Sequence, residues 1–272
     1  MKILLRVLLK PFPGAKRMLR RVYDLLFAKH SVSSHYVSIS KADVNHESAR
    51  LRSSWQADTL PVRQRALVDK QLADYQQGKP IDVFDVLVEA LRSISLGERP
   101  HSVLEVGCSS GYYSEVLKIK ELPYSYTGCD YSPAFIELGK LLYPGTPFYV
   151  QDATALGFED NAYDIVVSGC CLLHIPEYER AIAEAARVAR EYAIFHRTPV
   201  VTGLPHQYFR KQAYGIETVE IHFNEEQLLS LFDQYGLVIV NTFTLSRESD
   251  PDVPGAWRLN RTYLCRKTAD AD

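Results

Sequence analysis

The chain has 272 residues, of which 46% are apolar and 24% are charged, and its formal net charge at pH 7 is −2. This composition is ordinary for a soluble globular protein with one large core, alone or with an appendage. A net charge so close to zero provides no general attraction for nucleic acid, and we expect no nucleic-acid partner.

The cysteines lie within apolar runs, and none forms a C-x-x-C pair. They are Cys108, Cys129, Cys170, Cys171 and Cys265. An odd number of such thiols favours reduced core residues in the cytoplasm over a disulfide framework or a zinc site, so we expect no bound metal. No apolar stretch approaches the ~20 residues that a transmembrane helix needs.

Residues 1–30 are strongly basic, with Asp24 as the single acid. Their apolar run is short and lacks a small-residue cleavage site, so we expect the segment to be retained. Leu19, Val22 and Leu26 fall on one stripe of a helix whose other face is basic. Two interpretations stay open: peripheral binding to an anionic membrane at the cytoplasmic face, or packing on the protein with the basic face in solvent.

The next part of the chain favours helices. Residues 31–59 are polar and are predicted to be loop, and helices are predicted over residues 61–78 and 81–95. In the second helix apolar side chains recur at helical spacing, at Val83, Val86, Leu87, Ala90, Leu91 and Ile94. Residues 1–98 are therefore predicted to form a helical N-terminal extension ahead of an α/β domain over residues 99–272.

Strands and helices alternate from residue 101 onward. Two strands are predicted to end at Val106 and Asp130, and five more to cover residues 148–151, 164–169, 191–198, 237–245 and 260–266. Helices are predicted over residues 112–120, 132–145, 176–190 and 225–235. This alternation predicts a mostly parallel sheet with helices on both faces.

The stretch over residues 102–131 indicates a ligand site. A buried strand leads through Glu105 into a turn that contains Gly107 and Gly111, a helix follows, and the next strand ends at Asp130. Glycines without Cβ let the chain bend sharply and a ligand approach, and a helix N-terminus offers free N–H groups. Asp130 can accept hydrogen bonds from the hydroxyls of a ribose.

The turn reads Glu105-Val106-Gly107-Cys108-Ser109-Ser110-Gly111, which does not fit the G-x-G-x-x-G of NAD-binding units. It resembles motif I of the class I S-adenosylmethionine-dependent methyltransferases, Glu/Asp-x-Gly-x-Gly-x-Gly, with Ser109 in place of the middle glycine. The resemblance continues to about residue 200, through Asp152-Ala153, the strand over residues 163–168 and Leu173-His174-Ile175-Pro176. The family's usual Pro-Gly-Gly turn is replaced by Ala189-Arg190-Glu191, where we expect a tighter connection.

The resemblance implies a Rossmann-like sheet of seven strands in the order 3-2-1-4-5-7-6. It also implies in-line transfer of a methyl group from S-adenosylmethionine to an oxygen, nitrogen or carbon of a small molecule or glycan, leaving S-adenosylhomocysteine. The residues that it implies for cofactor binding are Glu105, Gly107, Cys108, Ser109, Gly111, Tyr112, Asp130, Tyr131, Asp152, Ala153 and Ser168. Packing in the core is the alternative for Cys108 and Tyr112. The alternative for Glu105 is a hydrogen bond to the backbone of the turn, and the alternative for Asp130 is capping of the following helix.

Catalytic and substrate-binding residues are expected where the fourth and fifth strands end. His174 and His196 are candidate general bases, with packing and hydrogen bonding as the alternative. Arg197 could clamp an anionic substrate or form a surface ion pair. In the insertion over residues 200–223 the candidate substrate contacts are His206, Tyr208, Arg210 and Tyr214. The alternative for this insertion is an ordinary surface helix and loop.

Two other functions remain open. The first is a non-catalytic module that binds S-adenosylmethionine or acts as a scaffold. The second is a nicotinamide-dependent oxidoreductase, which the missing G-x-G-x-x-G disfavours.

Overall fold

The structure is a computed structural model that describes residues 33–95, 101–250 and 252–268. Almost all of these residues belong to one compact unit, His35–Asp272. The basic segment over residues 1–30 lies outside the described residues, so its helix and its membrane contact stay predictions. In the part of the chain that is described, no helix has both the length and the apolar character needed to cross a membrane.

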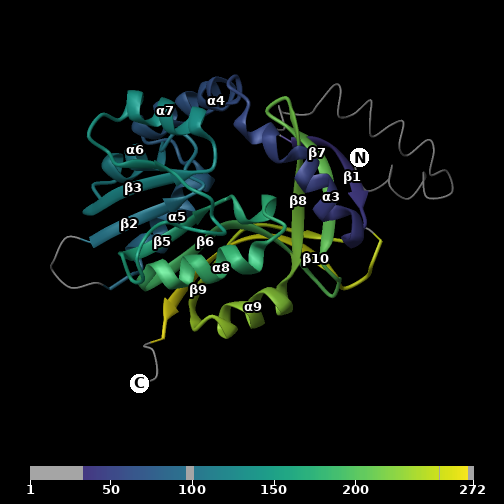
Figure 1. Ribbon diagram of the computed structural model, residues 1–272. Helices are drawn as coiled ribbons and strands as arrows, with labels where there is room; N and C mark the ends of the chain where they lie inside the picture. Colours follow the sequence, from purple (N-terminus) through teal and green to yellow (C-terminus); the bar gives the residue numbers. More distant parts are fainter. Residues whose placement is uncertain (1–32, 96–100, 251, 269–272) are drawn as a thin grey trace. The chain divides into compact units, whose positions relative to one another are not determined.

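Five described elements precede the predicted α/β domain (Figure 1). They are β1 (Ser33–Ile39), α3 (Lys41–Leu51), η1 (Arg52–Gln56), α4 (Leu60–Gln76) and α5 (Asp82–Arg92). The two predicted helices are thus present as α4 and α5. The prediction of a loop over residues 31–59 is wrong, because β1, α3 and η1 lie in that segment. The hydrophobic pattern of these segments was too weak to predict them, because β1 is largely exposed and α3 buries only Val44 and Leu51.

The predicted alternation of strands and helices is confirmed in the rest of the chain. Its first half contains β2 (His101–Val106), α6 (Tyr113–Ile119), β3 (Tyr124–Asp130), α7 (Pro133–Leu142), β4 (Phe148–Val150), β5 (Tyr163–Gly169) and η2 (Leu172–His174). Its second half contains α8 (Tyr178–Val188), β6 (Ala189–Thr202), β7 (Gln207–Ala213), β8 (Ile216–Asn224), α9 (Glu225–Gln234), β9 (Leu237–Ser249) and β10 (Trp257–Lys267).

The strands of the described chain form one mixed sheet of ten. β4, β3, β2, β5 and β6 are parallel neighbours in that order, and β10 pairs antiparallel with both β6 and β9. A second path leaves β6 through β8 and β7 to β1. The seven strands predicted from residue 101 onward lie in the predicted order 3-2-1-4-5-7-6, as β4, β3, β2, β5, β6, β10 and β9. The predicted count of seven is wrong for the whole sheet, because β1, β7 and β8 extend it from β6.

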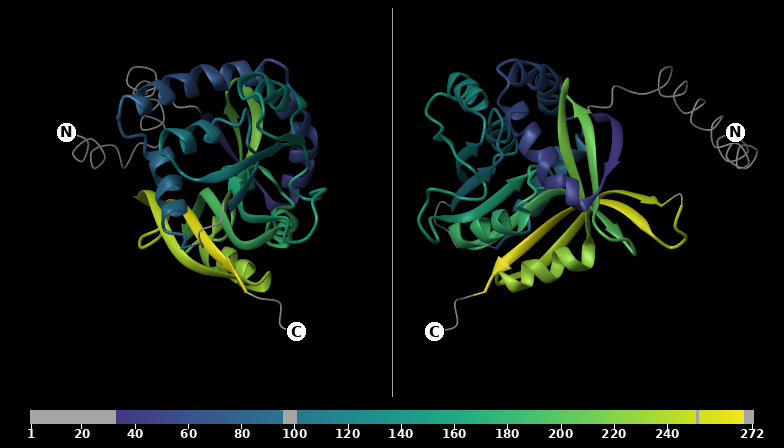
Figure 2. Two further views of the ribbon diagram at one scale, coloured as in Figure 1. Left: turned by 90° about the vertical axis from the view of Figure 1, so that its left-hand side faces the viewer. Right: turned by 45° about the vertical axis from the view of Figure 1, so that its right-hand side comes forward.

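Helices cover both faces of the parallel strands, as predicted (Figure 2). Successive strand residues point to opposite faces. On β2, Val103 packs in a cluster with α4, α5 and α6, whereas Leu104 packs in a cluster with α8 and α9. Both side chains are at most 2% exposed. The central strand β2 is therefore buried on both faces, so a ligand reaches it at the strand end.

The connection into β6 is as tight as expected. Ala189, the first residue of β6, directly follows Val188, the last residue of α8. The strand then continues for 14 residues, beyond its last pairing with β5, and there it pairs with β8. This extra length joins the parallel strands to the β7–β8 hairpin.

The insertion over residues 200–223 is a β-hairpin, so the interpretation as a surface helix and loop is wrong. Its two-residue turn, Tyr214-Gly215, has positive φ angles of 51° and 80°. Two such residues give a turn that suits the natural twist of a hairpin. Arg63 on α4 donates a hydrogen bond to the Tyr214 carbonyl oxygen (3.3 Å), which ties the hairpin tip to that helix.

Candidate active site

The glycine turn after β2 is a tight bend held from the neighbouring strand. The backbone N–H groups of Gly107 and Cys108 both donate to the Cys129 carbonyl oxygen, at 2.8 and 3.0 Å. Gly107 and Gly111 have φ angles of +75° and +73°. A Cβ on Gly107 would lie 2.4 Å from the Cys171 Cβ, so glycine is required here for conformation and for space.

We expect Gly107→Ala to destabilise the protein by more than the ~1–2 kcal/mol that a left-handed backbone costs a residue with Cβ, because Cys171 must also move. Gly145→Ala is the matched control, since Gly145 has φ +90° and no atom within 4 Å of its built Cβ. Urea denaturation of both variants measures the difference. Equal losses would show that the contact with Cys171 adds nothing.

Asp130, at the tip of β3, anchors the turn. Its two carboxylate oxygens accept hydrogen bonds from the backbone N–H groups of Ser109 (2.8 Å) and Ser132 (2.9 Å). Burial raises the pKa of Asp130 to about 6, although these two N–H groups oppose the shift. A carboxylate offers about four acceptor positions, so capacity remains for the hydroxyls of a ribose.

Glu105 is the second buried acid at this edge, with 2% of its surface exposed. The Tyr126 hydroxyl donates a hydrogen bond to its carboxylate. Burial raises the pKa of Glu105 to about 8; the Tyr126 hydrogen bond lowers this pKa, and the charge of Asp130 raises it further. Since no cation offsets the burial, a positively charged ligand beside Glu105 would favour its ionised form.

Several hydroxyls around the turn are buried without a hydrogen-bond partner among the described residues. They are the Oγ atoms of Ser109, Ser110 and Ser132. Buried polar groups in native proteins are nearly always bonded, so such a group of atoms fits a site that takes a polar ligand. Ser132 stands at the N-cap position of α7, but its side chain makes no capping bond.

The other residues predicted to bind the cofactor have varied surroundings. Cys108 is 1% exposed within a core cluster. The ring centroid of Tyr112 lies 4.7 Å from that of Tyr113. Both observations agree with the alternative of packing in the core. The Ser168 Oγ lies 3.4 Å from the Cys171 Sγ, next to the glycine turn. Asp152 accepts bonds from the backbone N–H and the hydroxyl of Thr154 at 2.9 and 2.8 Å. Tyr131 and Ala153, which follow Asp130 and Asp152, are half-buried.

His174 lies in η2, beside the hairpin. Its Nδ1 donates to the Val219 carbonyl oxygen on β8 (2.6 Å), and its ring centroid lies 4.8 Å from that of Trp55. Trp55 in turn donates to Thr218 (2.9 Å). Burial, and then the charge of Lys211, lower the pKa of His174 to about 4. This imidazole is therefore a weak base that joins η1, η2 and β8.

His196 lies inside the protein, with 1% of its surface exposed. Its Nε2 is 2.8 Å from the Tyr113 hydroxyl, and its Nδ1 is 3.0 Å from the Thr262 hydroxyl. Tyr113 also donates to the Val83 carbonyl oxygen (3.0 Å), so the Nε2–H must donate to Tyr113 and the Thr262 hydroxyl to Nδ1. Both nitrogens are used, and burial lowers the pKa well below the ordinary value. The geometry thus contradicts a general-base role.

A bulge displaces Arg197 from the regular strand. The β6–β10 register shifts between Arg261 and Tyr263, so that His196 and Arg197 together oppose Thr262. The Thr262 Oγ1 accepts from the Arg197 backbone N–H at 3.2 Å, and Arg197 has φ +56°. Bulges beside active sites re-aim side chains. Arg197 makes no ion pair with any described residue, so the surface ion-pair interpretation is wrong.

The residues predicted to bind substrate do not gather at one place. Tyr214 is one of the groups whose charge interactions raise the pKa of Arg197; the others are Cys170, Tyr113 and Tyr112. Arg210 instead pairs at the surface with Glu47 (3.5 Å) and Glu217 (3.7 Å), which argues against a role in substrate binding.

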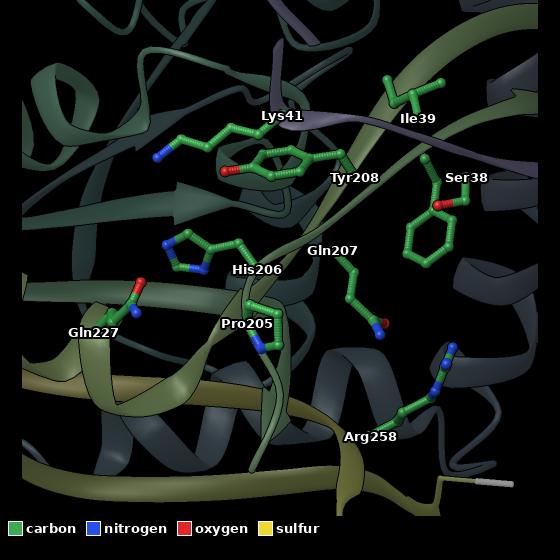
Figure 3. Close-up of a pocket in the computed structure, with 10 residues that line it drawn as sticks. Ser38, Ile39, Lys41, Pro205, His206, Gln207, Tyr208, Gln227 and Arg258 are labelled. Atoms are coloured by element: carbon green, nitrogen blue, oxygen red, sulfur yellow. The ribbon is translucent and has the colours of Figure 1, made fainter. Parts of the chain in front are cut away.

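His206 and Tyr208 line a cavity of about 580 Å³ (Figure 3). Its other lining residues are Ser38, Ile39, Lys41, Pro205, Gln207, Phe209, Gln227 and Arg258. Both His206 nitrogens are occupied, by the Asn224 backbone N–H (2.6 Å) and the Tyr178 hydroxyl (3.1 Å). None of the residues predicted to bind the cofactor lines this cavity, so it does not locate the glycine-turn site. Among the described residues no cluster of His, Cys, Asp and Glu could hold a metal ion.

Three residues that bond to the predicted site residues or to their neighbours were not predicted from the sequence. They are Tyr126, Trp55 and Thr262. Tyr126 had a readable signal, because Glu105 pairs with Gly128 and Tyr126 lies two residues earlier on the same face. The contacts of Trp55 and Thr262 join segments far apart in the chain, and no local pattern marks them.

Comparison with known proteins identifies a methyltransferase domain in the central part of the chain. Residues 104–196 match the family model described as "Methyltransferase domain". Over 95 residues the chain is 37% identical to phthiotriol/phenolphthiotriol dimycocerosates methyltransferase of Mycobacterium tuberculosis, covering 34% of this chain and 35% of that protein. Over 110 residues it is 33% identical to demethylmenaquinone methyltransferase of Renibacterium salmoninarum, covering 39% and 42%. The matches thus span about a third to two fifths of these relatives.

A solved structure shares the fold over a longer range. It is the 1,6-didemethyltoxoflavin-N1-methyltransferase of Burkholderia thailandensis, with bound 1,6-didemethyltoxoflavin and S-adenosylhomocysteine. The TM-score is 0.55, the identity 17%, and the match covers 82% of this chain and 90% of that one. At this identity the likeness concerns the fold alone.

Proposed function

We propose that the protein transfers a methyl group from S-adenosylmethionine to a small-molecule acceptor, on the basis of the match of residues 104–196 to the family model described as "Methyltransferase domain". The observation that carries this proposal is the pair of buried acids, Glu105 and Asp130, on either side of a glycine turn whose serine hydroxyls lack partners. This is a polar site built for a ligand at the open ends of parallel strands.

The site residues fit the cofactor by their chemistry. S-adenosylmethionine would supply a methyl group already activated on a positively charged sulfur. The spare acceptor capacity of Asp130 suits the ribose hydroxyls, and Glu105 suits the cationic end of the molecule. We assign the hydroxyls of Ser109 and Ser132, which lack partners among the described residues, to polar atoms of the same ligand. Residues 99–272 would then form the cofactor-binding domain.

The acceptor side is formed by the hairpin and the segment before α4. His174 bonds to Val219, Trp55 bonds to Thr218, and Tyr214 at the hairpin tip acts on Arg197. These contacts join β8 to η1 and to η2, the short helix that follows β5. The names of the relatives support a small-molecule or lipid acceptor. An oxygen, nitrogen or carbon nucleophile on such a molecule, or on a glycan, is the finer form of the proposal.

Calorimetry and a transfer screen test the proposal together. We expect S-adenosylmethionine and S-adenosylhomocysteine to bind the purified chain, and methyl-labelled cofactor to label a compound in a cell extract only when the chain is added. Mass analysis then identifies the product. Folded protein that binds neither ligand would contradict the proposal, whereas binding without any labelled product would favour a non-catalytic module.

A further inference from the structure

Beside Arg197, the backbones of β5 and β6 both depart from regular strand geometry at the same level of the sheet. Gly169 of β5 pairs with His196 of β6, and the next residue of each strand, Cys170 and Arg197, has a positive φ angle, 58° and 56°. Such angles are uncommon for residues with a Cβ and persist only where the surroundings impose them. Thr262 holds this bend through its bonds to His196 and Arg197.

The Arg197 side chain is half-buried, and the protein leaves part of its guanidinium without a partner. Its Nε is buried and has no hydrogen-bond partner, and no described carboxylate lies within ion-pair distance. The Cys170 thiol and the hydroxyls of Tyr113, Tyr112 and Tyr214 are the groups whose charge interactions raise the pKa of this guanidinium. A partly desolvated cation without a counter-charge is unfavourable, and an anion brought by a ligand would compensate for the lost hydration.

The two histidines at this edge leave few ways to remove a proton from an acceptor. His196 has both nitrogens occupied, and His174 is a weak base with its Nδ1 on Val219. A nucleophile that is ionised before transfer needs no general base. A fixed cation such as Arg197 stabilises that ionised form.

We propose, building on the function above, that Arg197 binds the ionised oxygen of a phenol-type or enol-type acceptor, with Tyr112 and Tyr214 beside its ring. The tyrosine rings suit a planar acceptor, and the planar guanidinium suits an anionic oxygen. The acceptor proton is released to solvent when the oxygen ionises. A lone pair of that oxygen then forms the new O–C bond, while the C–S bond breaks and its electron pair stays on sulfur.

This charge balance also favours product release. The acceptor anion and the sulfonium cation are both neutralised in the transfer, so the methylated product no longer carries the charge that Arg197 binds. The tyrosines remain available to the ring, but the charge-assisted hydrogen bond is lost.

The test uses 4-nitrophenol as a probe, because absorbance reports its ionisation. With saturating S-adenosylhomocysteine, the wild-type protein should bind the phenolate form and lower the apparent pKa of the bound probe. Arg197→Gln should weaken this binding by about 10- to 100-fold, the loss of one hydrogen bond to a charged group, and should abolish the pKa shift. Benzoate, titrated in parallel, tells a carboxylate site from a phenolate site.

Arg180→Gln is the matched control, since Arg180 is exposed on α8. It should leave both probes and S-adenosylhomocysteine binding unchanged. Equal phenolate binding by wild type and Arg197→Gln, no phenolate binding by wild type, or tighter binding of benzoate would overturn the proposal. A loss of S-adenosylhomocysteine affinity in Arg197→Gln would also overturn it, by placing the cofactor's own carboxylate on Arg197.

Failure of the proposed function is recognised separately. It appears as wild-type protein that binds no S-adenosylhomocysteine at all, whatever Arg197 carries. Melting temperatures verify that Arg197→Gln is folded.

Discussion

Asp130→Ala is expected to weaken S-adenosylhomocysteine binding by about 10- to 100-fold, which corresponds to 1–3 kcal/mol. The substitution removes the acceptors proposed for the ribose hydroxyls. It also removes the bonds to the Ser109 and Ser132 N–H groups, at 2.8 and 2.9 Å, that hold the glycine turn. Isothermal titration calorimetry measures the loss.

Two further variants separate these contributions. Asp130→Asn keeps one acceptor oxygen and the size of the side chain, so its loss should be intermediate. Asp233→Ala, at an exposed position on α9, controls for the substitution itself. An unchanged dissociation constant in folded Asp130→Ala would show that this carboxylate does not hold the ligand.

Glu105→Gln should make the ligand-free protein more stable at pH 9 than wild type, by on the order of 2–4 kcal/mol. In the folded protein the pKa of Glu105 is raised to about 8 by burial, against an ordinary value of 4.5. Between these two values the folded state keeps a proton that the unfolded chain has lost. The stability of wild type therefore falls as pH rises through this window, and glutamine removes that contribution.

Urea denaturation at pH 5, 7 and 9 measures the effect. Glu89→Gln, at an exposed position on α5, should retain the wild-type slope of stability against pH. The Glu105→Gln variant should also bind S-adenosylmethionine less tightly, because a neutral amide no longer balances its positive charge. Parallel stability curves for wild type and Glu105→Gln would contradict a buried, protonated Glu105.

The parts of the site that the sequence revealed are those encoded by adjacent residues. Gly107, Gly111 and Asp130 lie within one strand-turn-helix-strand unit, so their spacing alone placed them together. The small residues of the turn and the following helix also act locally. The closeness of these residues in space could therefore be predicted without knowing any contact between distant parts of the chain.

The missed features depend on partners that no local pattern identifies. β1, β7 and β8 join the sheet through pairings whose register is set across the fold. The bulge at Arg197 exists because Thr262, 65 residues later, bonds the displaced backbone. His196 was assigned a proton-transfer role because of its position at a strand end, but its burial against Tyr113 and Thr262 became visible only in three dimensions.

β6 belongs to two paths of the sheet, and the family match covers only its first part. The family match ends at residue 196, and the bulge occupies residues 196 and 197. Up to that point the strand lies within the matched segment. Beyond it, the same strand supports the β7–β8 hairpin, which lies outside the matched segment. Under the proposed function, substitutions in the hairpin would change acceptor choice and leave cofactor affinity as it is.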